Sequence, residues 1–225
     1  MILVVGATGV VGNAVVQRLR RNGKDVRAFV RDGANRDKRE ALVQAGATLA
    51  TGDLKDGATV RAGCAGIDTV ISTASATISR GEGDDIYSVD RDGQLQLVDA
   101  AREAGVRHFI YVSFSGNVTG SFPLHDAKRA VERRLQESGL TFTIVRPSFF
   151  MEVWLSPHAG FDPVGGQVRI YGTGDAKVSM ISAMDVAAYV AECVDNPSVH
   201  NQVIEIGGPE AVAPNAVVAL FEQAL

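Results

Sequence analysis

A glycine-rich turn near the start of the chain limits the possible folds more than any other feature. The motif Gly6-Ala7-Thr8-Gly9-Val10-Val11-Gly12 lies between an apolar run at 1–5 and an amphipathic pattern at 13–20, as in a strand–turn–helix unit. The free N–H groups and the dipole of a helix N-terminus favour a pyrophosphate at such a junction. Gly6 permits the tight turn, Gly9 lets phosphates approach the backbone, and Gly12 lets the helix pack close to the strand. The motif therefore predicts a dinucleotide site, the alternative being a glycine-rich turn without a ligand.

Strand and helix patterns continue to alternate through the 225 residues. Strands this apolar must be covered on both faces, which predicts an α/β fold with a doubly wound parallel sheet. Right-handed crossovers then place a ligand at the switch point beside the first strand. Apolar runs typical of strands lie at 2–6, 25–31, 47–51, 68–74, 107–113, 141–146 and 202–206, and helical patterns lie near 10–22, 36–45, 56–64, 90–104, 124–138, 183–195 and 213–224.

The pattern divides the chain into two parts. Residues 1–146 are predicted to form the dinucleotide-binding domain, and 147–225 a mixed segment of substrate-lobe loops plus the last strand and helices of the sheet. The stretch 147–182 is rich in proline and glycine and is the candidate for a small C-terminal substrate lobe. The chain ends inside a helical pattern at 221–225, so either this lobe is short and open or part of it is absent from the sequence.

Composition excludes several classes of function. The net charge of -4 argues against nucleic-acid binding, and no apolar run approaches the ~20 residues of a membrane span. Met1 opens directly into the first strand, so we expect no signal peptide. Cys64 and Cys193 lie in unrelated contexts and are expected to be small apolar fillers, and the scattered histidines predict no metal site. Together these features predict a cytoplasmic protein.

The end of the second strand bears on the choice of dinucleotide. NAD sites usually carry an acidic residue there, which accepts hydrogen bonds from the ribose hydroxyls. In this chain Val30 and Arg31 end the strand and the acid is displaced to Asp32, while Arg36 and Arg39 follow. Arg31 is placed to pair with a 2′-phosphate, which favours NADP(H) over NAD(H); a solvated arginine is the alternative.

Two further strand ends provide candidate cofactor contacts. After the third strand, Asp53 can accept from an adenine amino group while Leu54 packs against the ring; Asp53 also suits a helix N-cap. The fourth strand ends in small residues, among them Thr73 and Ala74, which let the cofactor's sugar and diphosphate pass closely.

Taken in order, these motifs make the chain resemble the NmrA-like branch of the atypical short-chain dehydrogenase/reductase superfamily. The resemblance implies a Rossmann fold, NADP(H) binding and, in the enzymes of the group, reduction of a small apolar acceptor such as a quinone, enone or related carbonyl by hydride transfer. It rests on the glycine turn, on Val30-Arg31-Asp32 and Gly52-Asp53-Leu54, and on the later stretches 99–101, 105–109 and 138–147.

The catalytic pattern of the superfamily is only half present. Its enzymes carry Tyr-x-x-x-Lys on the helix after the fifth strand, and here Lys128 has the lysine position while Leu124 replaces the tyrosine. Lys128 would hold the nicotinamide ribose or act as an electrophile, a solvated lysine being the alternative. His125 is the nearest group that can donate a proton, although one helical position rotates a side chain by ~100°. Because members with this departure include sensors, regulators and assembly factors, the alternative function is a non-catalytic NADP(H)-binding protein that docks a protein partner.

The remaining candidates lie after the fifth and sixth strands. Ser113 and Ser115 occupy the place of the superfamily's hydroxyl, and the sequence does not decide which faces the substrate. Pro147 is expected to carry the backbone past the nicotinamide carboxamide. Four residues could line an apolar substrate pocket or belong equally well to an ordinary core: Phe149, Phe150, Met151 and Trp154. Of these, Trp154 favours the pocket, because it lies in a loop-rich stretch.

Overall fold

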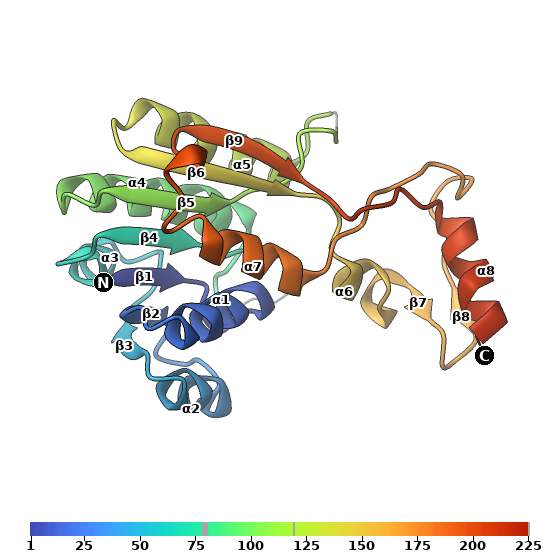
Figure 1. The fold of residues 1–225 in the computed structure, drawn as a ribbon, viewed down its shortest axis with the longest axis horizontal. Helices are drawn as coiled ribbons and strands as arrows, with labels where there is room; N and C mark the ends of the chain where they lie inside the picture. Colours follow the sequence, from blue (N-terminus) through green and yellow to red (C-terminus); the bar gives the residue numbers. More distant parts are fainter. Residues whose placement is uncertain (78–80, 119, 225) are drawn as a thin grey trace.

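A seven-stranded, entirely parallel sheet forms the centre of the computed structural model, which describes residues 1–77, 81–118 and 120–224 (Figure 1). The order β3-β2-β1-β4-β5-β6-β9 reverses direction beside β1, which confirms the predicted doubly wound sheet. The strands are β1 (Ile2–Val5), β2 (Val26–Val30), β3 (Thr48–Thr51), β4 (Thr69–Ser72), β5 (His108–Val112), β6 (Thr141–Pro147) and β9 (Gln202–Ile206).

Helices cover both faces of the sheet. One layer consists of α1 (Val10–Arg21), α2 (Arg36–Gln44) and α7 (Ala183–Glu192), and the other of α3 (Gly57–Cys64), α4 (Gln94–Glu103) and α5 (Pro123–Glu137). Each layer packs on its own apolar cluster. Within β1, Ile2 and Val4 belong to one cluster and Leu3 and Val5 to the other. Because side chains alternate between the two covered faces, β1 contains no polar position.

The helix predicted at 90–104 differs from the observed one. The segment begins as a π-helix, η1 (Ile86–Gly93), and continues as α4. Asp85 starts it with a capping box, because its side chain accepts from Ser88 N–H while the Ser88 hydroxyl accepts from Asp85 N–H. The predicted helix therefore begins four residues too late, at 90 instead of 86. The prediction relied on the pattern of apolar residues, which neither the cap nor the wider π-helical turn changes. The π-helix carries the fully buried Asp90.

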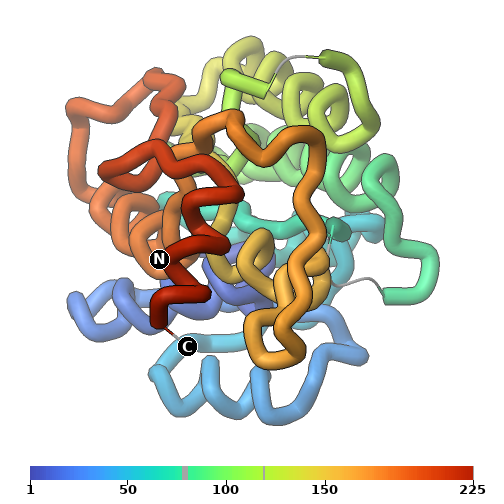
Figure 2. Tube along the Cα trace, turned by 90° about the vertical axis from the view of Figure 1, so that its right-hand side faces the viewer, coloured from blue at the N-terminus to red at the C-terminus, as the bar shows by residue number. Residues whose placement is uncertain are grey.

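The segment after β6 lies beyond the carboxyl ends of the strands, as Figure 2 shows from that side. It contains α6 (Met151–Trp154), the short turn η2 (Pro157–Ala159) and the hairpin of β7 (Phe161–Asp162) and β8 (Gln167–Val168). The chain then returns through α7, the turn η3 (Pro197–Val199) and β9 before α8 (Pro214–Ala224). Rings of Phe161 and Phe221, 4.9 Å apart, join the hairpin to α8. The role of this segment as a substrate lobe, and the division at 146, stay predictions. Among the described residues, no helix has the length and apolarity that a membrane crossing needs.

Candidate active site

The glycine turn is folded tightly against the end of β4. Gly6 has φ +84°, and a Cβ there would lie 2.7 Å from Thr73 Oγ1 and from Ala74 N. A Cβ on Gly12 would lie 2.2 Å from the Gly6 carbonyl oxygen. Gly9 differs, because a Cβ there would meet only the Gly6 carbonyl oxygen, at 3.2 Å. Gly6 and Gly12 are thus needed by the turn itself, whereas Gly9 keeps the outer surface of the turn free for a ligand.

The N-terminus of α1 has the features of an anion site. Its N-cap, Gly9, offers no side-chain acceptor, and no acidic residue lies in the first turn. Its first N–H groups have no intrahelical partner, and the helix dipole adds positive potential there. Thr8 and Val11 are half-buried and Val10 is 62% exposed, so the surface at this end is open. These features fit the pyrophosphate of a dinucleotide.

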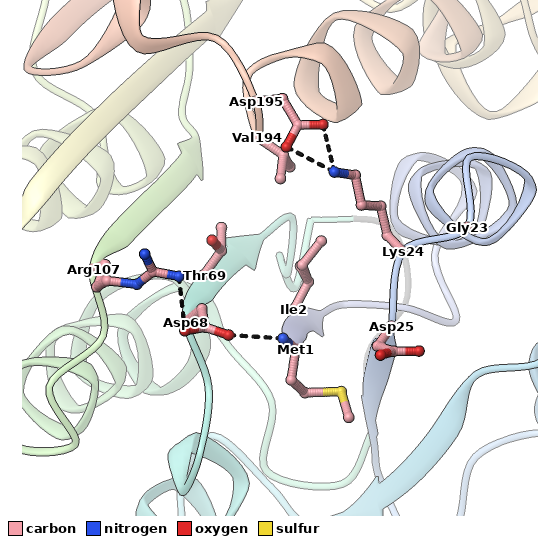
Figure 3. Close-up of a pocket in the computed structure, with 10 residues that line it drawn as sticks. All are labelled: Met1, Ile2, Gly23, Lys24, Asp25, Asp68, Thr69, Arg107, Val194 and Asp195. Carbon is pink, nitrogen blue, oxygen red and sulfur yellow. Dashed lines mark hydrogen bonds and ion pairs between the residues drawn. The ribbon is translucent and has the colours of Figure 1, made fainter.

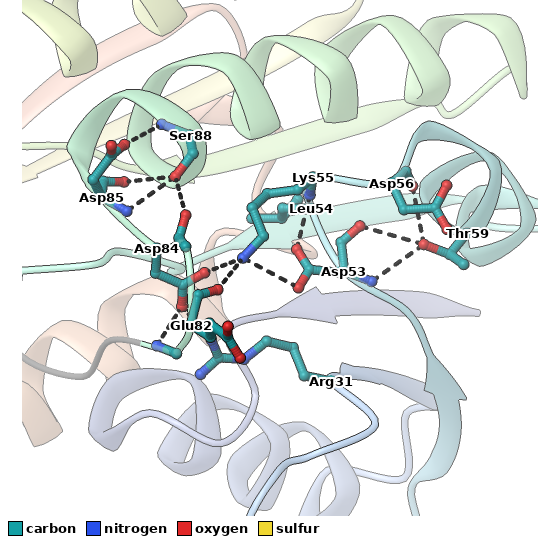
Figure 4. A network of polar contacts seen from close by, with 12 residues as sticks. Arg31, Asp53, Leu54, Lys55, Asp56, Thr59, Glu82, Asp84, Asp85 and Ser88 are labelled. Carbon is teal, nitrogen blue, oxygen red and sulfur yellow. Dashed lines mark hydrogen bonds and ion pairs between the residues drawn. The ribbon is translucent and has the colours of Figure 1, made fainter.

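Arg31, the predicted 2′-phosphate residue, belongs to a polar network (Figure 4). Its Nη1 donates to Asp84 Oδ2, and Lys55 Nζ donates to Asp84 Oδ1 and lies 3.5 Å from Asp53 Oδ2. The Asp84 side chain is 3% exposed, whereas that of Arg31 is 41% exposed. Burial raises the pKa of Asp84, but hydrogen bonds from Lys55 and the Gly81 N–H, with the charge of Arg31, outweigh it and hold that pKa below its ordinary value.

Neither of the other two arginines near the second strand is seen to join this network. Arg36 Nε pairs with Glu40 at 2.6 Å along α2, and Arg39 Nη1 donates to the Asp32 carbonyl oxygen at 2.9 Å. The network instead contains Lys55 and Asp84, which sequence reasoning missed. Asp84 lies 53 residues from Arg31, and no local pattern links the two.

Asp53 is not the cap of α3. It accepts from the Lys55 N–H at 2.8 Å, whereas Asp56 is the N-cap and accepts from the Ala58 N–H at 2.9 Å. The cap alternative for Asp53 was therefore wrong, because an extra turn separates β3 from the helix. Leu54 is 7% exposed and belongs to the core cluster of the α3–α5 layer. The adenine contacts assigned to Asp53 and Leu54 stay predictions.

Lys128 is fixed in the interior beneath the carboxyl edge of the sheet. The residue is 4% exposed, its Nζ lies 3.2 Å from Asp90 Oδ1, and Nζ is 5.2 Å from the Tyr111 ring centroid. Asp90 is fully buried, and its Oδ2 accepts from the Ala76 N–H at 2.9 Å. The alternative of a solvated lysine is therefore wrong. The ammonium is held in a preset position by a carboxylate on the π-helix and by the face of a tyrosine.

Tyr111 completes this buried group. Its hydroxyl has no hydrogen-bond partner within the described part of the chain. Burial, and then the charges of Asp90 and Glu132, raise its pKa well above the ordinary value. The phenol therefore stays protonated, and it lies inside the protein rather than at the position of the missing catalytic tyrosine.

Both candidate serines point toward carboxylates. Ser113 donates to Glu132, and Ser115 Oγ donates to Glu205 Oε2 at 3.0 Å; the two residues are 7% and 6% exposed. Arg146 links the carboxylates, with Nη2 2.6 Å from Glu132 Oε2 and Nη1 3.3 Å from Glu205 Oε1. Burial raises the pKa of Glu132, yet hydrogen bonds from Arg146 and Ser113 bring it below its usual value. This network fixes the loop after β5, and sequence reasoning missed its acidic members.

The start of α5 carries Leu124, at the position of the superfamily's tyrosine, and His125, the candidate proton donor. Leu124 is half-buried and lies one turn before Lys128. The His125 side chain is 23% exposed, and its Nδ1 lies 3.0 Å from Asp126 Oδ1. No hydrogen bond joins His125 to Lys128 among the contacts of the described residues, so the histidine is separate from the buried lysine.

A row of aromatic rings follows the carboxyl edge beside these residues. Neighbouring centroids along the row are 5.6, 5.9, 6.2, 4.9 and 6.4 Å apart. Of the predicted pocket residues, Phe149 and Trp154 belong to it, while Phe150 packs against the core and Met151 is 37% exposed at the start of α6. Pro147 is buried opposite Ile206. The members of this aromatic row are His125, Phe122, Phe114, Phe149, Trp154 and Tyr171.

A hollow of about 460 Å³ lies at the opposite, amino-terminal edge of the sheet (Figure 3). Most of its charged groups pair with one another: the Met1 amino group lies 2.8 Å from Asp68, Arg107 lies 2.9 Å from Asp68, and Lys24 lies 2.7 Å from Asp195. Asp25 pairs instead with Arg20, at 3.3 Å. The hollow is therefore remote from the glycine turn, and its charges are already satisfied. Among the described residues, no three His, Cys, Asp or Glu side chains gather to hold a metal.

Known proteins resemble this chain over its whole length. The model of the NmrA-like family matches residues 1–225. An NAD(P)H azoreductase of Xenophilus azovorans is 32% identical, over 100% of this chain and 73% of that protein. A photosystem II assembly factor of Trieres chinensis is 31% identical, over 99% of this chain and 68% of that protein. The structure of an NADPH-dependent quinone oxidoreductase of Escherichia coli, complexed with NADPH, gives a TM-score of 0.83 at 26% identity, and the match covers 100% of this chain and 75% of that one.

Proposed function

This chain belongs to the NmrA-like family, and from that premise we propose that it is an NADP(H)-dependent oxidoreductase that reduces a small apolar acceptor, such as a quinone, enone or related carbonyl. The observation that carries the proposal is the glycine turn at the uncapped N-terminus of α1, beside the point where the strand order reverses. The azoreductase and the quinone oxidoreductase among the similar proteins support it.

The chain's own residues fit a nicotinamide dinucleotide. The first turn of α1 would hold the pyrophosphate, and Arg31 with Lys55 would meet a 2′-phosphate, which is why we propose NADP(H) rather than NAD(H). Lys128, immobilised by Asp90, would fix the nicotinamide end through the ribose hydroxyls. When bound, this cofactor supplies a hydride to the acceptor.

The acceptor side of the proposal rests on the aromatic row. Rings such as Phe149 and Trp154 offer faces against which a planar apolar molecule can stack, and they exclude water from it. The tyrosine position holds Leu124, so no strong acid is available there. Quinones suit such a site, because the anion formed on their reduction is stabilised by hydrogen bonds and takes its proton from water.

A second function is favoured by the same leucine. A non-catalytic NADP(H)-binding regulator or assembly factor needs the dinucleotide turn but no acid, and one similar protein is a photosystem II assembly factor. In that case the aromatic row would contact a protein partner instead of a small acceptor.

One experiment separates the two functions. Calorimetry would measure the affinities for NADPH and NADH, and NADPH oxidation would be followed with a panel of quinones, enones, azo compounds and ketones. The reductase predicts turnover of at least one acceptor, and loss of that turnover in Trp154→Ala at nearly unchanged NADPH affinity. Tight NADPH binding without turnover of any acceptor would favour the regulator, and absence of dinucleotide binding would refute both.

A further inference from the structure

The carboxylate of Asp84 lies between two cations that are suited to a phosphate. Arg31 comes from the end of β2 and Lys55 from the turn after β3, and both donate to this one side chain (Figure 4). Asp84 comes from a third place, the turn 81–84 before η1, where it also accepts from the Gly81 N–H at 2.6 Å. Side chains from two separate elements therefore converge on a buried anion that a third element supplies.

The charges of this network cancel. Two cations, Arg31 and Lys55, face two carboxylates, Asp84 and Asp53. The hydrogen bond that Lys55 donates to Asp84, together with the charge of Asp53, raises the pKa of Lys55, so its ammonium stays charged at neutral pH. A 2′-phosphate brings about two negative charges of its own. It would meet a site that is already neutral and whose donors are already engaged.

We propose that Asp84 sets the preference between NADP(H) and NAD(H), because its carboxylate occupies the place on Arg31 and Lys55 that a 2′-phosphate takes when NADP(H) binds. The inference rests on the proposed function and deepens it. Binding of NADP(H) exchanges one anion for another, so the phosphate gains only the difference between the two sets of charge-assisted hydrogen bonds. NAD(H) has no 2′-phosphate and leaves Asp84 in place. Asp84 thus lowers the advantage that Arg31 alone would give to NADP(H).

The two cations of this network can be reached from solvent. Arg31 is 41% exposed on its side chain, so a phosphate can approach the guanidinium from solvent while Asp84 withdraws. Lys55, whose side chain is 31% exposed, can follow the phosphate because its stem is flexible.

The test compares Asp84→Asn with the parent protein. Asparagine retains the shape of the side chain but removes its charge, so the cations become free for a phosphate. Calorimetry should show NADPH and adenosine 2′,5′-bisphosphate binding about tenfold more tightly, with NADH and adenosine 5′-monophosphate changed by less than about twofold. Glu82→Gln is the matched control. It removes the same charge from the same turn, whereas the hydrogen bond that Lys55 donates to residue 82 goes to the backbone carbonyl oxygen, at 3.3 Å, and is retained.

A second variant keeps the proposal testable if Asp84→Asn does not fold. Lys55→Met should weaken NADPH and the bisphosphate about tenfold and leave NADH unchanged, because only the phosphate uses the ammonium. An unchanged or reduced preference for NADPH in folded Asp84→Asn would overturn the proposal and make Asp84 a residue that orients Arg31. Equal loss of NADPH and NADH in Lys55→Met would also overturn it. Parent protein that binds neither dinucleotide would instead refute the proposed function.

Discussion

The buried pair of Lys128 and Asp90 allows stability and function to be separated. Asp90 is 0% exposed, Lys128 is 4% exposed, and Asp90 Oδ1 has no hydrogen-bond partner in the described residues, so the ammonium 3.2 Å away is its main compensation. Lys128→Met retains most of the side-chain volume but leaves the carboxylate unpaired. Removing one member of a buried pair costs about 3–5 kcal/mol in free energy of unfolding. We expect that loss here.

The neutral double variant should recover most of this stability. In Lys128→Met with Asp90→Asn both members of the pair are uncharged, and the asparagine oxygen can still accept from the Ala76 N–H. Exchanging a buried ion pair for uncharged groups is often close to neutral, so the double variant should lie within about 2 kcal/mol of the parent. Urea unfolding followed by circular dichroism measures all four proteins of the cycle. Losses that simply add would refute the reasoning, because they would mean that the two side chains do not compensate each other.

The double variant then tests the role of the ammonium in the reaction. It should fold with nearly parental stability yet oxidise NADPH about tenfold or more slowly with a quinone, since the group that would hold the nicotinamide ribose is absent. Asp90→Asn alone retains the ammonium and serves as the comparison. Parental kcat/KM in a folded double variant would show that Lys128 acts only in the fold.

Three further outcomes follow from other sites. Gly9→Val should leave the fold intact, because a Cβ there meets only one backbone atom, at 3.2 Å. It should abolish binding of NADPH and NADH in calorimetry, whereas Val10→Ala should have a mild effect. Normal NADPH binding by folded Gly9→Val would place the phosphate elsewhere. Burial, helped by His200, lowers the pKa of His108 to about 4. The free energy of unfolding should therefore be highest above pH 6.5 and fall by up to about 3 kcal/mol as the pH falls toward 4, because the buried ring must stay uncharged. Urea midpoints should show this fall, and His108→Gln should remove it. His125→Ala should alter quinone reduction little and the parent should reduce ketones poorly, so rapid ketone reduction that disappears in this variant would make the histidine the acid.

Local sequence determined the elements of the sheet and the glycine turn after its first strand. Runs such as 2–5 are apolar at every position because both faces of each strand are covered, and that requirement can be seen without knowing what covers them. The tight turn at Gly6 and the close approach at Gly12 were predicted correctly, because both depend on backbone geometry within seven residues of sequence. The role of Gly9 toward a phosphate stays a prediction. The start of η1 was not predicted, because the pattern of apolar residues does not distinguish a π-helical turn from an α-helical one.

The partners of the candidate site residues were decided only by tertiary structure. Arg31 was found from its place at a strand end, but its pairing with Asp84 depends on a turn 53 residues away. Lys128 was placed correctly on its helix, yet its burial against Asp90 follows from how α5 packs on η1. Phe149 and Trp154 gained neighbours from distant loops in the same way. The physical reason is that strand and helix periodicity follows from steric constraints within a few residues. A charged group or an aromatic ring, by contrast, interacts with residues that only the completed fold brings close to it.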